Sequence, residues 1–401
     1  MKPPWLRGFA NAVLVLSAAD ALLSLLDEAL RAAAGADWLA APRSAVAQLA
    51  LIGVAATVPA MLATPRLPVA VFAPLAIATF WLTLGAAPLP LWIEPGPLLD
   101  AVGCVLQLAA VALAFALVRA RSGARRWWFD EGGPERPAFA WRHSLAFGAA
   151  LLSLGPLAAV GYTAVAFATW AQVVTHGFIH FGLTGVSLAD RHYQRGGREI
   201  RLVGMMHIGD RDAYRALTRS FAHESTIVLA EGVSDRDERL AGSLHYGHAA
   251  QAIGLTPQED LSTYLVEGTG PQAQTLAWPI VRHADVDASV FSPGTIACIQ
   301  WASEVWEAED LPSALRAILR GAREQGPERL AAFQNEVLGL RNEHLVKEID
   351  RALGDYEHVV VPWGALHLPA IEQAVLSWGF AETSRELHPL FAWSTIAAAL
   401  L

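Results

Sequence analysis

The sequence predicts a membrane-embedded helical region followed by a soluble α/β domain, and two observations support this prediction. Residues 1–176 are mostly Ala, Leu, Val, Pro and Trp, whereas residues 177–401 have the mixed composition of a soluble protein. In the second part, an apolar run ending in Gly-x-x-His occurs twice, each time followed by a helix-like stretch. We therefore expect an N-terminal all-α transmembrane bundle of about five helices over 1–176. A C-terminal α/β domain with a mainly parallel sheet and a helical middle region should follow over 177–401.

The first part contains stretches that are long and apolar enough to span a bilayer, which takes roughly 20 residues of helix. They lie at approximately 8–26, 44–64, 68–92, 98–118 and 146–171. No short apolar core followed by a cleavage site of small residues occurs, so a cleaved signal peptide is disfavoured. The alternative is a buried soluble bundle, and the succession of such stretches argues against it.

The distribution of positive charge predicts the orientation in the membrane. If the N-terminus is cytoplasmic, the cytoplasmic loops hold Lys2, Arg7, Arg66, Arg119, Arg121, Arg125, Arg126, Arg136 and Arg142, and the opposite loops hold Arg31 and Arg43. With an odd number of spans, residues 177–401 then lie outside, and we expect an integral protein of the plasma (inner) membrane. A break of the last stretch at Gly155-Pro156 into a re-entrant pair would instead leave the C-terminal domain in the cytoplasm. Asp20 and Gln107 are polar groups inside the predicted spans, with either a packing or a functional role.

Charge and cysteine content limit the partners. Residues 1–176 hold 11 Lys and Arg and 9 Asp and Glu, which leaves 18 and 29 of the totals of 29 and 38 for residues 177–401. Such an acidic domain is a poor binder of phosphate backbones, so we expect no nucleic-acid partner. The expected partners are the lipid bilayer and a peptide or protein substrate. Cys104 and Cys298 imply no disulfide framework and leave the redox compartment open.

The second part reads as an α/β domain from Arg198 onward. An expected strand, helix and strand form a βαβ unit, in which the two strands should be parallel and adjacent. A helical middle region over 233–355 is interrupted by a short apolar run, and a last strand and helix follow. The expected elements are strands at Ile200–Met206, Thr226–Ala230 and His358–Trp363, helices at Arg211–His223 and 369–378, and the apolar run at Leu276–Val281.

The repeated motif predicts a metal site. His207 and His367 follow the two apolar runs, with Gly204 and Gly364 as expected turn glycines, and Glu231 follows the second strand of the βαβ unit. Parallel strands present their carboxyl ends at one edge, where open α/β sheets bind ligands. Neutral imidazoles and a carboxylate at that edge suit a divalent transition metal and a hydrolytic reaction. For Glu231, a charge at a helix N-terminus is the alternative role.

Other polar residues could complete the site. Arg341, which precedes Asn342 in a helix-like stretch, could hold a substrate carboxylate or stabilise an oxyanion, or be an ordinary exposed or salt-bridged arginine. His283, Asp285 and Asp287 follow an apolar run and could supply a further ligand or support the ligands through hydrogen bonds. No Gly-x-Ser-x-Gly motif occurs, and neither cysteine has a catalytic context, which disfavours a serine or cysteine nucleophile.

Together these motifs resemble the TraB/PrgY/GumN superfamily, which includes the TIKI proteins. The matching segments are Val203-Gly204-Met205-Met206-His207, Ala230-Glu231-Gly232, Arg341-Asn342 and Pro362-Trp363-Gly364-Ala365-Leu366-His367, with Gly254-Leu255 and Gln258 as a secondary feature. The resemblance covers about residues 200–380 and not the membrane part. For the TIKI branch it implies a metal-dependent peptidase of the manganese or cobalt class. For the PrgY branch it implies inhibition of a secreted peptide signal.

From the residues and the resemblance we expect a membrane-anchored metal-dependent peptidase or related hydrolase that acts on peptides at the outer face. His207 and His367 are the expected metal ligands, Glu231 a ligand or general base, and Arg341 with Asn342 further catalytic residues. Two alternatives remain open. One is a non-catalytic protein that binds or inhibits a peptide signal, and the other is a membrane scaffold or transporter with a regulatory domain.

Overall fold

The computed structural model describes residues 3–86, 89, 96–122, 126–131, 136–221, 224–240, 246–258 and 279–400. The chain forms two compact units, Met1–Trp170 and Ala171–Leu401, where the sequence predicts a division at 176/177. Of the charged residues used for the orientation, Lys2 and Arg125 lie outside the described residues. The two units are described separately below.

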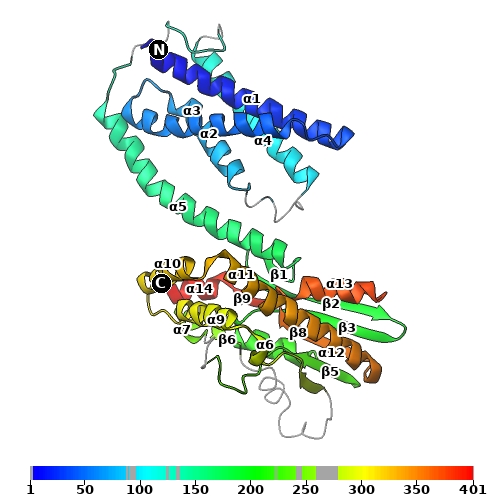
Figure 1. Cartoon of the computed structure of the whole chain (residues 1–401). Coiled ribbons are helices and arrows are strands. Elements are labelled where there is room, and N and C mark those ends of the chain that lie inside the picture. The colour runs from blue at the N-terminus through cyan, green and yellow to red at the C-terminus, as the bar shows by residue number, and fades with distance from the viewer. Residues whose placement is uncertain are drawn as a thin grey trace. The chain divides into compact units, whose positions relative to one another are not determined.

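The first unit is helical (Figure 1). Its described helices are α1 Pro4–Ala34, α2 Ala40–Ala63, α3 Val69–Thr83, α4 Pro97–Arg121 and α5 Trp141–Val174. Four of them, α1, α2, α4 and α5, are long and apolar enough to cross a membrane. The third expected span is represented by the 15 residues of α3, which rise only about 22 Å against the roughly 30 Å of a bilayer core. Part of that span, residues 87, 88 and 90–92, lies outside the described residues.

The last expected span is not interrupted at Gly155-Pro156. Gly155 and Pro156 lie inside α5, which continues unbroken from Trp141 to Val174. A proline inside a helix removes one backbone hydrogen bond and is tolerated in membrane helices. The re-entrant alternative is therefore not what the structure has.

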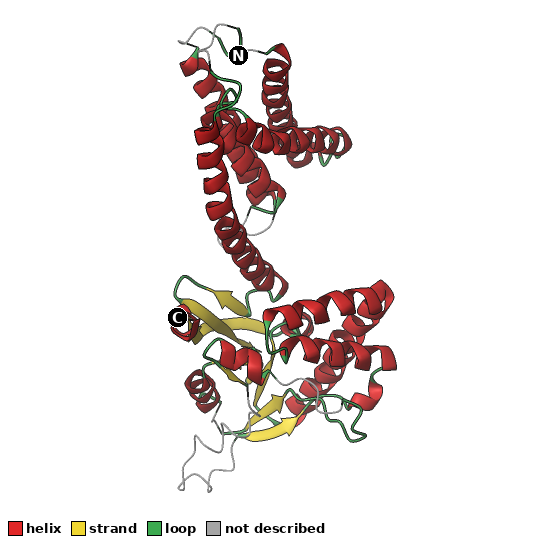
Figure 2. Ribbon diagram, turned by 90° about the vertical axis from the view of Figure 1, so that its left-hand side faces the viewer, coloured by secondary structure: helices red, strands yellow, loops and turns green. Residues whose placement is uncertain are grey.

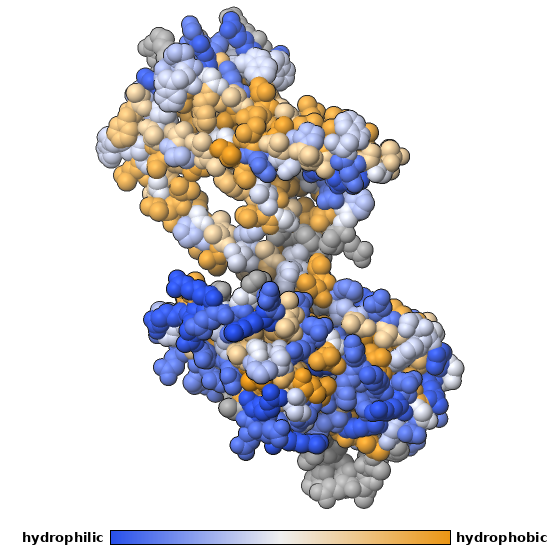
Figure 3. All heavy atoms as spheres, viewed as in Figure 1, coloured by the Kyte–Doolittle hydropathy of each residue, from blue (hydrophilic) through white to orange (hydrophobic). Residues whose placement is uncertain are grey.

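Apolar side chains of this unit lie on its surface as well as in its core. Leu6, Val13, Leu14 and Phe72 lie in the buried core where α1 packs against α2 and α4. Large apolar side chains are also exposed on these helices, among them Ile52, Ile77, Val105, Leu152 and Val160. Figure 3 shows broad apolar areas on this unit and a largely hydrophilic face on the second. Exposed apolar surface of this extent is typical of helices in contact with lipid.

The second unit is built on a seven-stranded mixed sheet in the order β1-β2-β3-β8-β5-β7, with β9 paired to β2. The strands β3, β8, β5 and β7 are mutually parallel, while β1, β2 and β9 join by antiparallel pairing. Their bounds are β1 Ile179–Phe181, β2 Gly185–Arg195, β3 Arg198–Met205, β5 Thr226–Ala230, β7 Ile280–His283, β8 His358–Gly364 and β9 Ala381–Ala392. The two residues of β4, Ile208–Gly209, pair with β6, Thr256–Pro257.

The strands of the expected βαβ unit, β3 and β5, are parallel but not adjacent. β8 lies between them and pairs with both, so the prediction of adjacency is wrong. The helix that links them, α6, runs over Arg211–Arg219. The inserted strand is the one that carries the second Gly-x-x-His motif. Its position brings three candidate strand ends next to one another.

Helices cover both faces of the sheet (Figure 2). On one face, α12 (Arg341–Asp355) and α13 (Leu368–Ser377) pack against Val359 and Val361, and on the other, α6 packs against Val360. This alternation is the pattern of a strand buried on both faces. The middle region is mostly helical where it is described, as predicted. Its helices and those that follow are α7 Gly247–Ala252, η3 Ala288–Val290, α9 Pro293–Trp306, α10 Leu311–Glu324, α11 Gly326–Gln334, the π-helical segment η4 Asn335–Leu340, α12 Arg341–Asp355, α13 Leu368–Ser377 and α14 Trp393–Leu400.

Candidate functional site

The carboxyl ends of β3, β8 and β5 meet at one edge of the sheet, and each is followed by a predicted site residue. His207 lies two residues beyond β3, His367 lies three beyond β8, and Glu231 directly follows β5. The registers of β8 with β3 and with β5 place these ends side by side. The sequence therefore predicted the edge correctly.

Arg341 is the cation at this edge. Its guanidinium donates to both carboxylate oxygens of Asp285, at 2.9 and 2.6 Å, and to Oε1 of Glu231 at 2.6 Å. A third group, Nη1, donates to Nε2 of His367 at 3.1 Å. Arg341 is buried and is the first residue of α12, directly after the π-helical η4. Glu231, Asp285, Arg341, Asn342 and His367 form what we call the edge cluster.

The contacts of His367 fix its tautomer. Since arginine only donates, Nε2 must be the acceptor, and Nδ1 therefore carries the proton that is donated to Oδ1 of Asn342 at 2.7 Å. Burial, together with the charge of Arg341, lowers the pKa of His367 to about 4. The imidazole is thus neutral at physiological pH, with its Nε2 lone pair directed into the edge cluster. The indole of Trp363 lies edge-on to this ring, at 5.2 Å between centroids.

Glu231 remains ionised although it is buried. Burial alone would raise the pKa of its carboxyl, but Arg341 and a hydrogen bond from the backbone of Gly364 hold it below its ordinary value. That bond, from the amide nitrogen of Gly364 to Oε2, measures 2.6 Å. Oε1 of the same carboxylate lies 3.7 Å from Nε2 of His367. A carboxylate and an imidazole lone pair therefore meet beside the guanidinium.

His207 lies apart from the hydrogen bonds of the edge cluster. Its side chain is exposed, and its ring stacks on Tyr246 at 4.9 Å between centroids and 7° between planes. Tyr246 in turn makes an edge contact with Trp306 on α9. Burial and the nearby charge of Glu231 raise the pKa of the Tyr246 phenol. The sequence did not predict a role for Tyr246.

The two motif glycines are required for space. A Cβ atom on Gly204 would lie 2.5 Å from the carbonyl oxygen of Phe178, and one on Gly364 would lie 3.3 Å from Oε2 of Glu231. Neither glycine has a positive φ. Gly364 begins a turn that is closed by the amide of His367 at 2.8 Å, as predicted. Gly204 instead lies inside β3, so the prediction of a turn at this glycine is wrong.

The polar residues after β7 divide between two roles. Asp285 belongs to the edge cluster, where it also accepts from the amide of Gly232 at 3.1 Å. Asp287 begins η3 and accepts from the Ser234 hydroxyl at 2.8 Å, which fixes the segment after β5. His283 is exposed at the end of β7. Of the three, Asp285 is therefore the one that orients Arg341.

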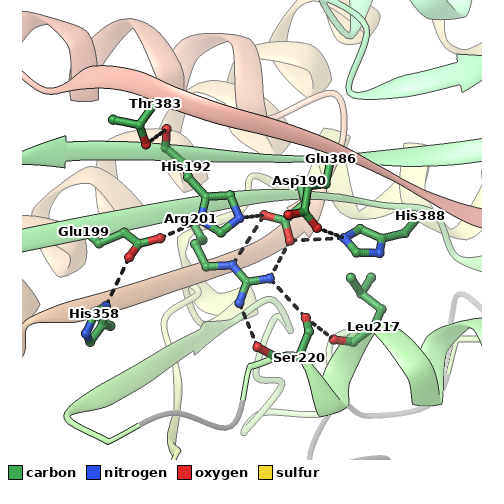
Figure 4. Close-up of polar contacts among 10 residues, drawn as sticks. All are labelled: Asp190, His192, Glu199, Arg201, Leu217, Ser220, His358, Thr383, Glu386 and His388. Atoms are coloured by element: carbon green, nitrogen blue, oxygen red, sulfur yellow. Dashed lines mark hydrogen bonds and ion pairs between the residues drawn. The ribbon is translucent and has the colours of Figure 1, made fainter.

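A second polar cluster lies on β2, β3, β8 and β9 (Figure 4). Buried Asp190 accepts from Arg201 at 2.5 Å and from His388 at 3.3 Å, and Glu199 pairs with His192 at 2.5 Å and His358 at 3.3 Å. Its charged groups are paired with one another and with the Ser220 hydroxyl. We interpret it as the polar link between strands of the antiparallel part of the sheet.

The described residues contain no group of three or more His, Cys, Asp and Glu side chains placed to hold a metal ion. Comparisons with protein-family models, with curated proteins and with solved structures found no match to this chain. The site must therefore be interpreted from its own geometry and from its motifs.

Proposed function

We propose that this protein is a membrane-anchored metal-dependent peptidase or related hydrolase that acts on peptides at the outer face of the membrane. One observation carries the proposal. Glu231, Arg341, Asn342 and His367 come from segments far apart in the sequence, yet they form one hydrogen-bonded cluster beyond the carboxyl ends of parallel strands. Ligands bind at this edge in open α/β sheets.

The donor groups fit a divalent metal ion in their chemistry. His367 presents a neutral nitrogen, and its Nδ1 proton is held by Asn342, the kind of outer hydrogen bond that orients metal-binding histidines. Glu231 is an ionised carboxylate, and His207 offers a second, exposed imidazole at the same edge. Two nitrogens and a carboxylate suit manganese, cobalt or zinc. These three side chains are the ligands that we propose.

The remaining residues have separate tasks. A bound divalent ion would polarise a substrate carbonyl and lower the pKa of a water molecule. Glu231, being ionised, can accept the proton of that water if it is not itself a ligand. Arg341 holds Glu231 and Asp285 in place, and its guanidinium is suited to stabilise a developing oxyanion or bind a substrate carboxylate. Asn342 is a positioning residue, since it acts through His367.

A specific observation favours a second candidate, a non-catalytic protein that binds a peptide signal. The guanidinium of Arg341 already donates to Glu231 and to Nε2 of His367, so two of the three proposed ligands have a cationic partner without a metal. A cluster satisfied in this way carries two carboxylates against one guanidinium, and it could hold the amino group of a peptide by charge alone. Turnover separates the two candidates.

The test is peptide hydrolysis by the full-length protein in detergent, with added Mn²⁺ and with a chelator. We expect metal-dependent turnover that is lost in His367→Ala and Glu231→Gln. Asn342→Leu should weaken metal affinity about 10- to 100-fold while retaining turnover at saturating metal. The matched control is Gln334→Leu, an exposed amide on α11. Saturable peptide binding with no turnover under any metal would refute the hydrolase and support the binding protein.

A further inference from the structure

The helical unit contains a second polar site, which the peptidase proposal does not use. Ser17, Asp20, Ser24 and Asp27 follow one another at intervals of three and four residues along α1, and all are buried. Residues at this spacing share one face of a helix. A polar face with two carboxylates is expensive inside an apolar helical bundle, and ionisable groups in membrane spans are functional candidates by default.

Asp20 is held by a neutral partner from another helix. The side-chain amide of Gln107, on α4, donates to Oδ2 of Asp20 at 2.5 Å. The two polar residues that the sequence singled out inside separate spans are therefore partners. The geometry also orients the amide: because an ionised carboxylate only accepts, the nitrogen must face it, and the amide oxygen lies on the other branch.

The second carboxylate of this face is neutralised by paired cations. Asp27 accepts from Arg31 and Arg43, both at 2.8 Å, and Glu28 pairs with the same arginines at 3.0 and 3.2 Å. Two acids thus face two bases at this end of α1. Arg43 acts on Asp20 electrostatically, but its guanidinium is bound by Asp27 and Glu28. Within the described residues, the direct polar contact of Asp20 is the uncharged amide.

Three buried oxygens along this face have no partner. Among the described residues, Oγ of Ser17, Oδ1 of Asp20 and Oδ1 of Asp27 accept or donate no hydrogen bond. Ser17 is 5% exposed and Asp20 is 6% exposed, so bulk water does not serve them. A buried polar atom without a partner destabilises the fold and calls for a bound water or ion.

We propose that Asp20 and Ser17, beside the amide of Gln107, form a binding site for a small monovalent cation of the Na⁺ class. The unpartnered carboxylate oxygen of Asp20 and the unpartnered hydroxyl of Ser17 are hard oxygen ligands, which alkali and alkaline-earth cations prefer to nitrogen or sulfur. The single negative charge of Asp20 determines the valence of the cation that fits. One cation of charge +1 neutralises Asp20, whereas a divalent ion would leave a buried excess of positive charge.

The test measures ²²Na⁺ binding to the full-length protein in detergent, with the thermal midpoint recorded in Na⁺ and in N-methyl-D-glucamine at equal ionic strength. We expect saturable binding and a higher midpoint in Na⁺. Ser17→Ala should weaken Na⁺ binding about tenfold, the loss of roughly 1.4 kcal/mol of one ligand, and Asp20→Asn should abolish it. Asp100→Asn, an exposed acid on α4, is the matched control and should bind as the wild type does.

For the Asp20→Asn protein, the thermal midpoint shows whether the fold is intact independently of Na⁺ binding. Without a buried charge, its midpoint in N-methyl-D-glucamine should equal or exceed that of the wild type, which separates lost binding from misfolding. Wild-type protein that binds no Na⁺, or Asp20→Asn protein that still binds it, would refute the site. A midpoint that depends on pH but not on Na⁺ would assign a proton to Asp20 and equally overturn the proposal.

Discussion

At the scale of single residues, Arg341 has the largest effect on the edge cluster. The sequence left open whether it was an exposed arginine or a site residue, because a helix-like stretch does not reveal which residues from other segments its side chain meets. In the structure it holds Glu231, Asp285 and His367 together. The side chains of the two carboxylates are 11% and 0% exposed, and Arg341 is the cation that both of them contact.

Replacing Arg341 should therefore cost stability as well as function. Arg341→Met leaves Glu231 and Asp285 buried without a counter-charge, for which we expect a loss of about 3–5 kcal/mol in the free energy of unfolding. Arg341→Lys keeps the positive charge but loses the planar set of N–H donors of the guanidinium. It should lose roughly 2 kcal/mol in the free energy of unfolding and most of the turnover. Denaturant unfolding followed by tryptophan fluorescence measures both losses. An Arg341→Met protein as stable as the wild type would show that the carboxylates do not need the cation.

The lowered pKa of the Asp190 carboxyl predicts how the stability of the fold depends on pH. Burial would raise the pKa of its carboxyl, but hydrogen bonds from His388 and Arg201 outweigh burial and lower it below the ordinary value. A carboxyl whose pKa is lower in the folded state stabilises the fold above its unfolded pKa of about 4, and this contribution is lost as the pH falls through the folded value. We expect the thermal midpoint of Asp190→Asn to fall less than that of the wild type between pH 5 and about 3. Parallel curves for the two proteins would refute this assignment.

At the scale of elements, three of the parallel strands, β3, β5 and β8, were predictable, and the antiparallel strands were not. β3, β5 and β8 are short apolar runs with a Gly near the end of β3 and β8 and a Glu directly after β5, and the motif residues lie at or just beyond these ends. The insertion of β8 between β3 and β5 was missed, since a strand more than 120 residues later in the sequence leaves no local signal. β9 was also missed because it is mostly exposed, contains Pro389 and shows no apolar alternation. Tyr246 was missed for a related reason, because only tertiary packing brings it onto His207.

The end of β3 depends on the close approach of two backbones at Gly204. A Cβ atom at this position would lie 2.5 Å from the Phe178 carbonyl oxygen, and the backbone would have to shift. Gly204→Ala should cost about 1–3 kcal/mol, as overpacking of a core does, and should displace His207. Gly354→Ala, on α12 with no atom near the added Cβ, is the control and should be neutral or stabilising. Denaturant unfolding of both variants checks this, and equal stabilities would show that β3 accommodates the methyl group.

At the scale of the whole molecule, the number of spans decides on which side the α/β unit lies. Five spans with a cytoplasmic N-terminus place it outside, but the described part of α3 is too short to cross alone, and four spans would place it in the cytoplasm. The excess of Arg and Lys in the proposed cytoplasmic loops favours the first arrangement for the N-terminus.

We expect a reporter fused after Leu401 to be active only in the outer compartment, because the proposed topology has an odd number of crossings. Paired fusions of a cytoplasmic and an exported reporter measure this directly, and fusions after Arg66, which follows two spans in either arrangement, serve as the cytoplasmic reference. Activity of the cytoplasmic reporter after Leu401 would reduce the spans to an even number and move the proposed peptidase to the cytoplasmic face.

We propose that the edge cluster and His207 together hold a divalent metal ion. The most direct measurement is the metal content of the full-length protein by elemental analysis after equilibration with Mn²⁺ and removal of free metal. We expect about one ion per chain, a number set by one set of ligands, with loss in His207→Ala and in His367→Ala. His358→Ala, at the opposite end of β8, should keep its metal. Wild-type metal content in both His207→Ala and His367→Ala would contradict the account.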